Sequence, residues 1–287
     1  MQLSFRFADV TLCISRQRAF CVSEAIRRFA VSDGAADLTV VMDQPDPQME
    51  EMTLSYVGDD LFRRYYRNGS AFRIELKGAN GSSTAVLTCR SGREVLHYCV
   101  YFNGGNGASI TGWLTLLPMA WLLYPYKVLF LHSSRVAWKG GAILFSAASG
   151  VGKTTQAKLW QTYGGGRVAG NDRTLLRRKD GVWQTYGYFG DGDAPIASPE
   201  RLPLRAIVLL EQAEENRVRR HAPARAVQLL MGQTVLAQWD EAMRQSLLNE
   251  WLTLVQEIPI YGLQCRADQD AVLCLQRQLK IDEGAIQ

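Results

Sequence analysis

A glycine-containing loop between an apolar run and a helix-forming segment constrains this chain more than any other feature. The run Ala142–Ser146 (Ala-Ile-Leu-Phe-Ser) is typical of a buried strand. The sequence Ala-Ala-Ser-Gly-Val-Gly-Lys-Thr follows it, and Lys153–Tyr163 then has the composition of a helix. A strand, a loop and a helix in this order predict an α/β domain.

The loop has the spacing of a phosphate-binding P-loop, with Ala147 in place of the first glycine. Gly150 and Gly152 allow backbone N–H groups to turn inward and approach phosphate oxygens. Lys153 supplies a charge for the β- and γ-phosphates, and Thr154 supplies a hydroxyl for Mg²⁺. The segment therefore predicts binding of a nucleoside triphosphate, ATP with Mg²⁺. An ordinary glycine-rich turn would leave Lys153 and Thr154 unexplained. The predicted nucleotide-binding residues are Ser149, Gly150, Val151, Gly152, Lys153, Thr154 and Thr155.

Aspartates after two short segments are further candidates. Asp172 follows the predicted strand Arg167–Gly170, where a carboxylate can hold Mg²⁺ or accept a proton from a hydroxyl. An aspartate in a plain turn is the alternative. Asp191 and Asp193 lie in a Gly-Asp-Gly-Asp sequence, where an ordinary acidic turn is as good an interpretation as a metal or substrate contact.

His132 closes the apolar run Val128–Leu131. Taken alone, it is better interpreted as a capping or core histidine than as a functional one.

Composition limits the class of protein. The 287 residues allow one large domain or two ordinary ones, and 47% of them are hydrophobic. The formal charge of +4 suits an anionic ligand but is too weak to indicate nucleic acid. The six cysteines contain no Cys-x-x-Cys pair, so we expect buried free thiols and a cytoplasmic protein. The N-terminus lacks the basic-then-apolar layout of a signal peptide.

One apolar stretch, Trp113–Leu131, has the length of a membrane span. Pro118 and Pro125 interrupt it and Lys127 lies within it, so a buried helix followed by a strand is the better interpretation.

The chain changes character near Tyr124. Short β-type runs such as Ala71–Leu76 dominate residues 1–124, which we predict to form a β-rich N-terminal domain. Residues 125–287 are predicted to form the nucleotide-binding catalytic domain. Its further expected elements are two separate strands at Val128–Leu131 and Val136–Trp138, a strand at Leu204–Glu211, and helices at Trp239–Gln256 and Asp268–Leu279, the last with Asp268 as N-cap.

In their order, Leu131-His132-Ser133, the P-loop and Gly170-Asn-Asp-Arg173 resemble the C-terminal domain of HPr kinase/phosphorylase. That domain belongs to the phosphoenolpyruvate-carboxykinase-like P-loop class, so the resemblance implies an α/β (α+β overall) kinase fold. It implies that His132 lies near the transferred phosphate and that Asp172 serves as Mg²⁺ ligand and catalytic base. Asn171 stands where the family has a second acid, and the family's later Glu-Ile-Arg-Gly motif is absent.

More narrowly, the chain is similar to HPr-kinase-like proteins of lasso peptide biosynthetic clusters. The runs that carry this similarity are Ile143–Ala147, Thr155–Trp160, Asn171–Arg178 and Leu204–Gln212. The similarity implies phosphorylation of a serine in a ribosomally made precursor peptide, with residues 1–124 recognising the substrate or covering the site. The rivals are a small-metabolite kinase and a non-catalytic nucleotide-binding regulator, the latter favoured by Asn171. We expect no nucleic-acid or membrane partner, and a homo-oligomer is left open.

Overall fold

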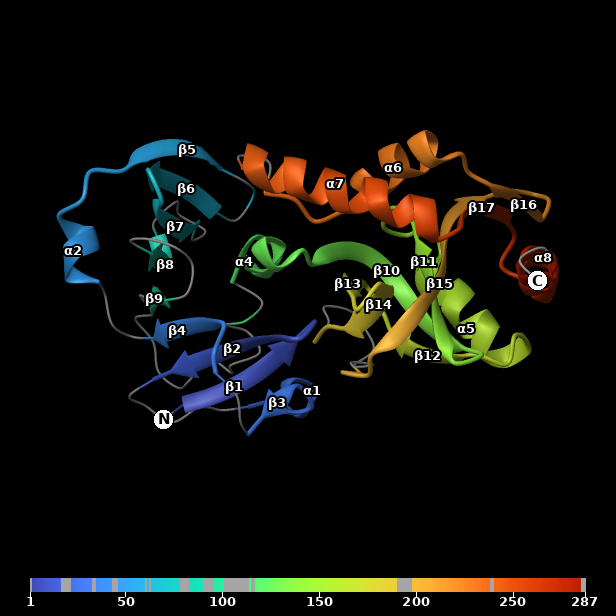
Figure 1. Ribbon diagram of the computed structural model, residues 1–287, viewed down its shortest axis with the longest axis horizontal. Helices are drawn as coiled ribbons and strands as arrows, with labels where there is room; N and C mark the ends of the chain where they lie inside the picture. Colours follow the sequence, from blue (N-terminus) through green and yellow to red (C-terminus); the bar gives the residue numbers. More distant parts are fainter. Residues whose placement is uncertain are drawn as a thin grey trace. The chain divides into compact units, whose positions relative to one another are not determined.

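The computed structural model describes residues 2–16, 22–32, 35–42, 46–59, 61, 63–77, 83–89, 95–100, 114, 117–189, 198–237 and 240–284. Contacts divide the chain into two units (Figure 1). Unit 1 comprises Met1–Leu122 and Gln238–Glu241, and unit 2 comprises Leu123–Ala237 and Ala242–Gln287. The sequence suggested a single boundary near Tyr124, whereas the chain returns to unit 1 at Gln238–Glu241.

Unit 1 is built around a nine-stranded sheet in the order β3-β1-β2-β4-β9-β8-β7-β6-β5. Strand β4 pairs in parallel with β2 and with β9, and the other pairings are antiparallel. Alternate side chains of β4 and β7 are buried, which gives the sheet an apolar face. The strands are β1 (Gln2–Phe7), β2 (Val10–Ser15), β3 (Ala30–Val31), β4 (Leu38–Met42), β5 (Ser55–Asp59), β6 (Arg63–Asn68), β7 (Ala71–Lys77), β8 (Ser83–Cys89) and β9 (Val95–Val100).

Three short helices accompany this sheet: α1 (Glu24–Arg27), α2 (Pro47–Glu50) and α4 (Met119–Leu123). Trp121 of α4 packs edge-on against Phe72, with ring centroids 4.4 Å apart. Its indole Nε1 donates a 2.6 Å hydrogen bond to Asp240 Oδ2, which explains why the segment around Asp240 belongs to unit 1. The predicted helix followed by a strand is found here, since α4 is followed by a 3-10 turn (Tyr124–Tyr126) and a strand from Leu129. No helix among the described residues is long and apolar enough to cross a bilayer.

Unit 2 contains an eight-stranded mixed sheet with helices, as the α/β prediction requires. Its order is β11-β10-β13-β14-β15-β17-β16; β12 pairs with β10, and β11 also pairs with β15. The strands are β10 (Leu129–Trp138), β11 (Gly141–Ser146), β12 (Arg167–Gly170), β13 (Arg173–Lys179), β14 (Val182–Gly187), β15 (Leu202–Gln212), β16 (Arg217–Arg220) and β17 (Ile260–Cys265). The helices are α5 (Lys153–Tyr163), α6 (Pro223–Met231), α7 (Glu241–Glu257) and α8 (Gln269–Gly284).

The two strands predicted at Val128–Leu131 and Val136–Trp138 are wrong as separate elements, because β10 is one continuous strand. The polar sequence between them suggested a break. In the structure, the first part of β10 pairs with β13, from Leu129 to His132, and the second part pairs with β11, from Ser133 onward. The polar side chains are buried but bonded: for example, Ser134 Oγ donates to Asn171 Oδ1 at 2.8 Å.

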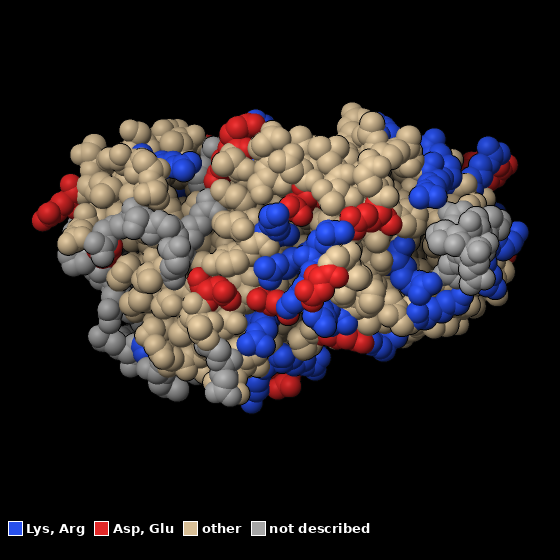
Figure 2. Space-filling view, viewed as in Figure 1, with Lys and Arg blue, Asp and Glu red and all other residues tan. Residues whose placement is uncertain are grey.

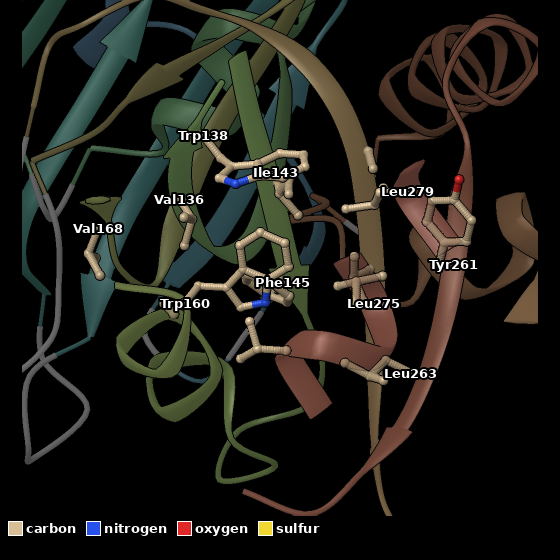
Figure 3. Close-up of a cluster of buried hydrophobic side chains, with 14 residues drawn as sticks. Val136, Trp138, Ile143, Phe145, Trp160, Val168, Tyr261, Leu263, Leu275 and Leu279 are labelled. Atoms are coloured by element: carbon tan, nitrogen blue, oxygen red, sulfur yellow. The ribbon is translucent and has the colours of Figure 1, made fainter. Parts of the chain in front are cut away.

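The core of unit 2 lies between the parallel strands β11, β15 and β17 and the helices α5 and α8 (Figure 3). Trp160 of α5 is fully buried and meets Trp138 edge-on, with ring centroids 5.3 Å apart. Leu275 of α8 enters the same cluster. The predicted N-cap of α8 is confirmed, because Asp268 Oδ1 accepts a 3.0 Å hydrogen bond from the Ala271 backbone N–H. This core fixes β11 and α5, the two elements that flank the P-loop.

Replacing Leu275 with alanine should lower the free energy of unfolding of the full chain by about 2–5 kcal/mol, because it leaves a cavity under α8. Leu252→Ala is the matched control, since Leu252 lies on α7 and is 46% exposed. Its effect should be within about 0.5 kcal/mol. Urea denaturation followed by tryptophan fluorescence measures both, and equal losses in the two variants would contradict this account of the core.

Candidate functional site

The P-loop begins where β11 ends. Gly150 has φ +80° and Gly152 φ +119°, and a Cβ at either position would meet nothing within 4 Å. Glycine is therefore required by the backbone conformation rather than by crowding. Gly152 is the N-cap of α5 and supplies no side chain to the first turn. The first N–H groups of α5 thus remain available to an anion at the positive end of the helix.

Lys153 is held inside this loop. Its side chain is 8% exposed, and Nζ donates to the carbonyl oxygens of Ala147 and Ala148 at 3.0 and 3.1 Å. Burial lowers the pKa of this ammonium, and the charge of Asp172 opposes that shift. Lys153 and Asp172 are therefore close enough to influence each other, although 19 positions separate them in the sequence.

Thr154 is oriented by Asn171. Its Oγ1 donates a 2.8 Å hydrogen bond to Asn171 Oδ1, and Ser134 Oγ donates to the same oxygen at 2.8 Å. Because the Thr154 proton points at Asn171, the lone pairs of its oxygen point elsewhere and can meet a metal ion. The Asn171 side-chain amide accepts both hydrogen bonds without placing a negative charge beside Thr154. Ser134 was missed by the sequence analysis, because a serine inside an apolar strand carries no motif.

Asp172 and His132 form a pair. His132 Nε2 lies 2.9 Å from Asp172 Oδ1, and the side chains of both are about 30% exposed. The hydrogen bond from His132 is the main cause that lowers the pKa of Asp172; burial opposes it, and the charges of His132, Arg173 and Lys153 add to the lowering. Asp172 is therefore an ionised carboxylate whose second oxygen, Oδ2, lies 3.7 Å from Arg173 Nε. The interpretation of His132 as a plain core histidine does not describe this contact.

The backbone at Asp172 is unusual. Its φ is +83°, in the left-handed region that aspartate and asparagine tolerate better than most residues. The Asp172 carbonyl oxygen accepts a 2.9 Å hydrogen bond from the Ser133 N–H, which ties this turn to β10 next to His132. The conformation is thus held by the same strand that carries the histidine.

The structure brings His132, Lys153, Thr154 and Asp172 together. Ser149, Gly150, Val151 and Gly152 form the loop itself, and Thr155 lies exposed in the first turn of α5. Asp191 and Asp193 lie outside the described residues. Within the described ranges, no three His, Cys, Asp or Glu side chains gather as a metal site. A Mg²⁺ ion here could take Thr154 and Asp172 as protein ligands, which suits an ion that keeps water and phosphate ligands.

Arg135 supports the site from beneath and was not foreseen from the sequence. It is completely buried in β10, and its four hydrogen bonds all go to backbone carbonyls. These acceptors are Thr185 at 3.2 Å, Glu200 at 2.8 Å, Ala169 at 3.1 Å and Ser198 at 2.8 Å. Burial lowers the pKa of the guanidinium to about 10. Because Ala169 belongs to β12, which runs directly into Asn171 and Asp172, Arg135 fixes the base of the turn that carries Asp172. A charged residue within a buried strand is the one signal that could have revealed it.

A family model described as SynChlorMet cassette protein ScmC matches residues 110–270, more than half of the chain. The chain belongs to the ScmC family. The matched residues of this ScmC protein include the whole P-loop and the turn with Asn171 and Asp172.

Among solved structures, the chain is similar to the HPr(Ser) kinase/phosphatase from Coxiella burnetii. The match has 10% sequence identity and a TM-score of 0.33, and it covers 54% of this chain and 93% of that one. No curated protein matches the ScmC chain.

Arg135→Met should lower the free energy of unfolding by at least about 2 kcal/mol, because it removes the donor of four hydrogen bonds to backbone carbonyls, two of them buried. Arg135→Lys should fall between this variant and the wild type, since an ammonium reaches fewer of the carbonyls. Arg277→Met, at an exposed position on α8, is the control. Chemical denaturation measures all three. Wild-type stability of Arg135→Met would show that the guanidinium is dispensable for this part of the fold.

Proposed function

We propose that this ScmC protein is a kinase that transfers the γ-phosphoryl group of Mg²⁺-ATP to a serine hydroxyl of a peptide or protein. One observation carries the proposal: the P-loop residues Lys153 and Thr154 converge on the turn that holds the His132–Asp172 pair. A structural P-loop would have no need of an ionised carboxylate with a histidine partner beside it.

The nucleotide would be bound by the loop. The N–H groups at the start of α5 and the Lys153 ammonium would contact the β- and γ-phosphates, where negative charge accumulates during transfer. Mg²⁺, when bound, neutralises charge on these phosphates. The Thr154 hydroxyl has its proton committed to Asn171 and its lone pairs available for the ion. The Asp172 carboxylate is the second protein ligand that fits.

The acceptor serine would meet Asp172. The serine Oγ would form a bond to the γ-phosphorus of ATP. At the same time the bond between this phosphorus and the oxygen that bridges the β- and γ-phosphates would break, and ADP would leave. The serine proton passes to Asp172 Oδ2, the carboxylate oxygen not bonded to His132. The lowered pKa makes Asp172 a weak base, but a loose phosphoryl transition state requires positioning more than strong proton abstraction. His132 holds the carboxylate in place and lies beside the transferred group.

For the acceptor, we propose a ribosomally made precursor peptide of the lasso type and a cytoplasmic setting. The sequence similarities in the P-loop domain support the peptide, and Cys13, Cys89, Cys265 and Cys274 are free thiols, which suits the setting. Unit 1 would recognise this peptide or cover the site.

Asn171 favours one rival, a nucleotide-binding regulator without turnover. Its neutral amide occupies a position where the resemblance leads us to expect a second carboxylate, and it binds Thr154 directly. Incubation with Mg²⁺-ATP and candidate peptides, read by mass spectrometry, separates the two. A gain of one phosphate on a serine supports the kinase, phosphorylation of metabolites alone supports a small-metabolite kinase, and tight ATP binding without any product supports the regulator.

Lys153→Ala should reduce the rate of phosphoryl transfer on the order of a hundredfold or more, because one buried charge serves the transition state. ATP affinity, measured by calorimetry, should also fall. Lys158→Ala removes an exposed lysine from the same helix and should leave both quantities unchanged. Transfer by Lys153→Ala at the wild-type rate would remove the basis for assigning the loop to phosphate binding.

Asp172→Asn should lower the transfer rate by about 10²–10⁴-fold, as expected for loss of a group that accepts a proton. The fold should survive, because asparagine tolerates the positive φ of this position. Asp180→Asn is a matched control, since Asp180 also has positive φ but lies exposed in the β13–β14 turn.

The pH dependence gives a second measurement on Asp172. A lowered pKa keeps the carboxylate ionised until the pH falls below its ordinary value of 3.8, so its stabilising contacts are present above that pH and are lost only below it. Asp172 should therefore cause no inflection in the rate between about pH 5 and 8. A fully active and stable Asp172→Asn variant would place the base elsewhere.

His132→Gln should lower the rate more than the affinity for ATP.

A further inference from the structure

The outer edge of the unit 2 sheet is formed by β16. Within the described residues this strand pairs only with β17. The His221 N–H donates to the Ile260 carbonyl at 2.8 Å. This hydrogen bond identifies which alternate residues of β16 hydrogen-bond to β17. Arg217, Arg219 and His221 direct their backbone groups toward β17, so Val218 and Arg220 direct theirs outward. The edge can therefore accept another strand at Val218 and Arg220.

This edge is strongly basic. The nine residues from Arg217 to Arg225 contain four arginines, one histidine and no acid. Figure 2 shows Lys and Arg gathered on the surface where Figure 1 draws β16. All four arginines are exposed, and among the described residues only Arg217 has an acidic partner, Glu215 at 2.6 Å. Arg219, Arg220 and Arg225 form no ion pair within the part of the chain that the structure describes.

Gly262 of β17 leaves room for the side chains of Arg219 and His221 to lie close together over the sheet. A Cβ at this position would come within 2.7 Å of His221 Nε2 and 3.5 Å of Arg219 Nε. Burial lowers the pKa of His221, and the charges of Arg219 and Arg225 lower it further. The neighbouring arginine charges thus disfavour a charged His221, and a bound anion would offset their effect.

We propose that β16 binds an extended acidic segment of the peptide substrate as an added strand. The peptide backbone pairs with Val218 and Arg220, and its carboxylates meet Arg219 and Arg225, the two arginines whose charges act on His221. Successive side chains of an added strand alternate between the two sides of the sheet, so acids at every second position would reach Arg219 and His221 together. An open strand edge fits a peptide better than a nucleic acid, because β16 carries no aromatic side chain for stacking bases. The inference rests on the proposed peptide kinase activity and names the chemistry of its substrate.

The probe is a fluorescein-labelled ten-residue peptide with alternating glutamate and threonine, and binding to the full chain is read by fluorescence anisotropy without ATP. The double variant Arg219→Glu/Arg220→Glu should bind it at least about tenfold more weakly than the wild type. The control Lys158→Glu/Arg277→Glu makes the same change of net charge at exposed positions on α5 and α8 and should bind as the wild type does.

Two further probes separate strand pairing from simple charge attraction. A peptide with glutamine in place of glutamate should bind about tenfold more weakly, and so should a glutamate peptide with alternate backbone N–H groups methylated. Equal binding by the double variant and the control would overturn the proposal. So would equal binding of the methylated peptide, or tighter binding of a single-stranded oligonucleotide at the same salt concentration. The binding assay contains no ATP, so its result does not depend on whether the chain is a kinase. Conversely, loss of peptide binding at β16 would not contradict the proposed kinase activity.

Discussion

The site depends on β11, a strand on which every residue is buried and which ends at the P-loop. The strand lies between β10 and β15, antiparallel to one and parallel to the other, so the position of Ser146 is fixed from both sides. From there the chain must reverse into α5 through two glycines with positive φ. A loop that binds anions through backbone N–H groups works only if its ends cannot shift, because its donors are aimed by the backbone itself. The cluster around Trp160 and Leu275 supplies that rigidity.

Strand β10 brings the acidic part of the site to the loop. It leaves β13 and joins β11 at Ser133, so His132 stands at the point where the pairing changes. The same strand places Ser134 against Asn171 and Arg135 beneath β12. Polar side chains inside a sheet are costly unless bonded, and here each of them orients the turn that carries Asp172. The cost of burying these groups is thereby linked to the geometry of the site.

Asn171 sets the charge of the site. It accepts hydrogen bonds from two hydroxyls and leaves Asp172 as the carboxylate beside Lys153. The charge of unit 2 is unevenly distributed: the Asp172 carboxylate lies beside the loop, whereas Arg219 and Arg220, which form no ion pair among the described residues, lie on β16 at the outer edge of the sheet. In the functions proposed above, the phosphoryl group would be transferred at the loop and an acidic peptide would be recognised by charge at β16. The net charge of the chain is only +4, although cationic side chains are concentrated at β16.

Local chemistry explains what the sequence by itself determined: the α/β class, the P-loop with Lys153 and Thr154, the helix after it, and the Asp268 cap of α8. Each of these depends on residues within a few positions of one another, where periodicity, glycine conformation and capping act directly. Tertiary structure alone decided the rest. The continuity of β10 is one example, and the pairing of His132 with Asp172, the Asn171 bridge and the Arg135 carbonyl contacts join residues 17 to 65 positions apart. No local pattern encodes such contacts, because the free energy of burying a polar group depends on the partners that the folded chain brings to it.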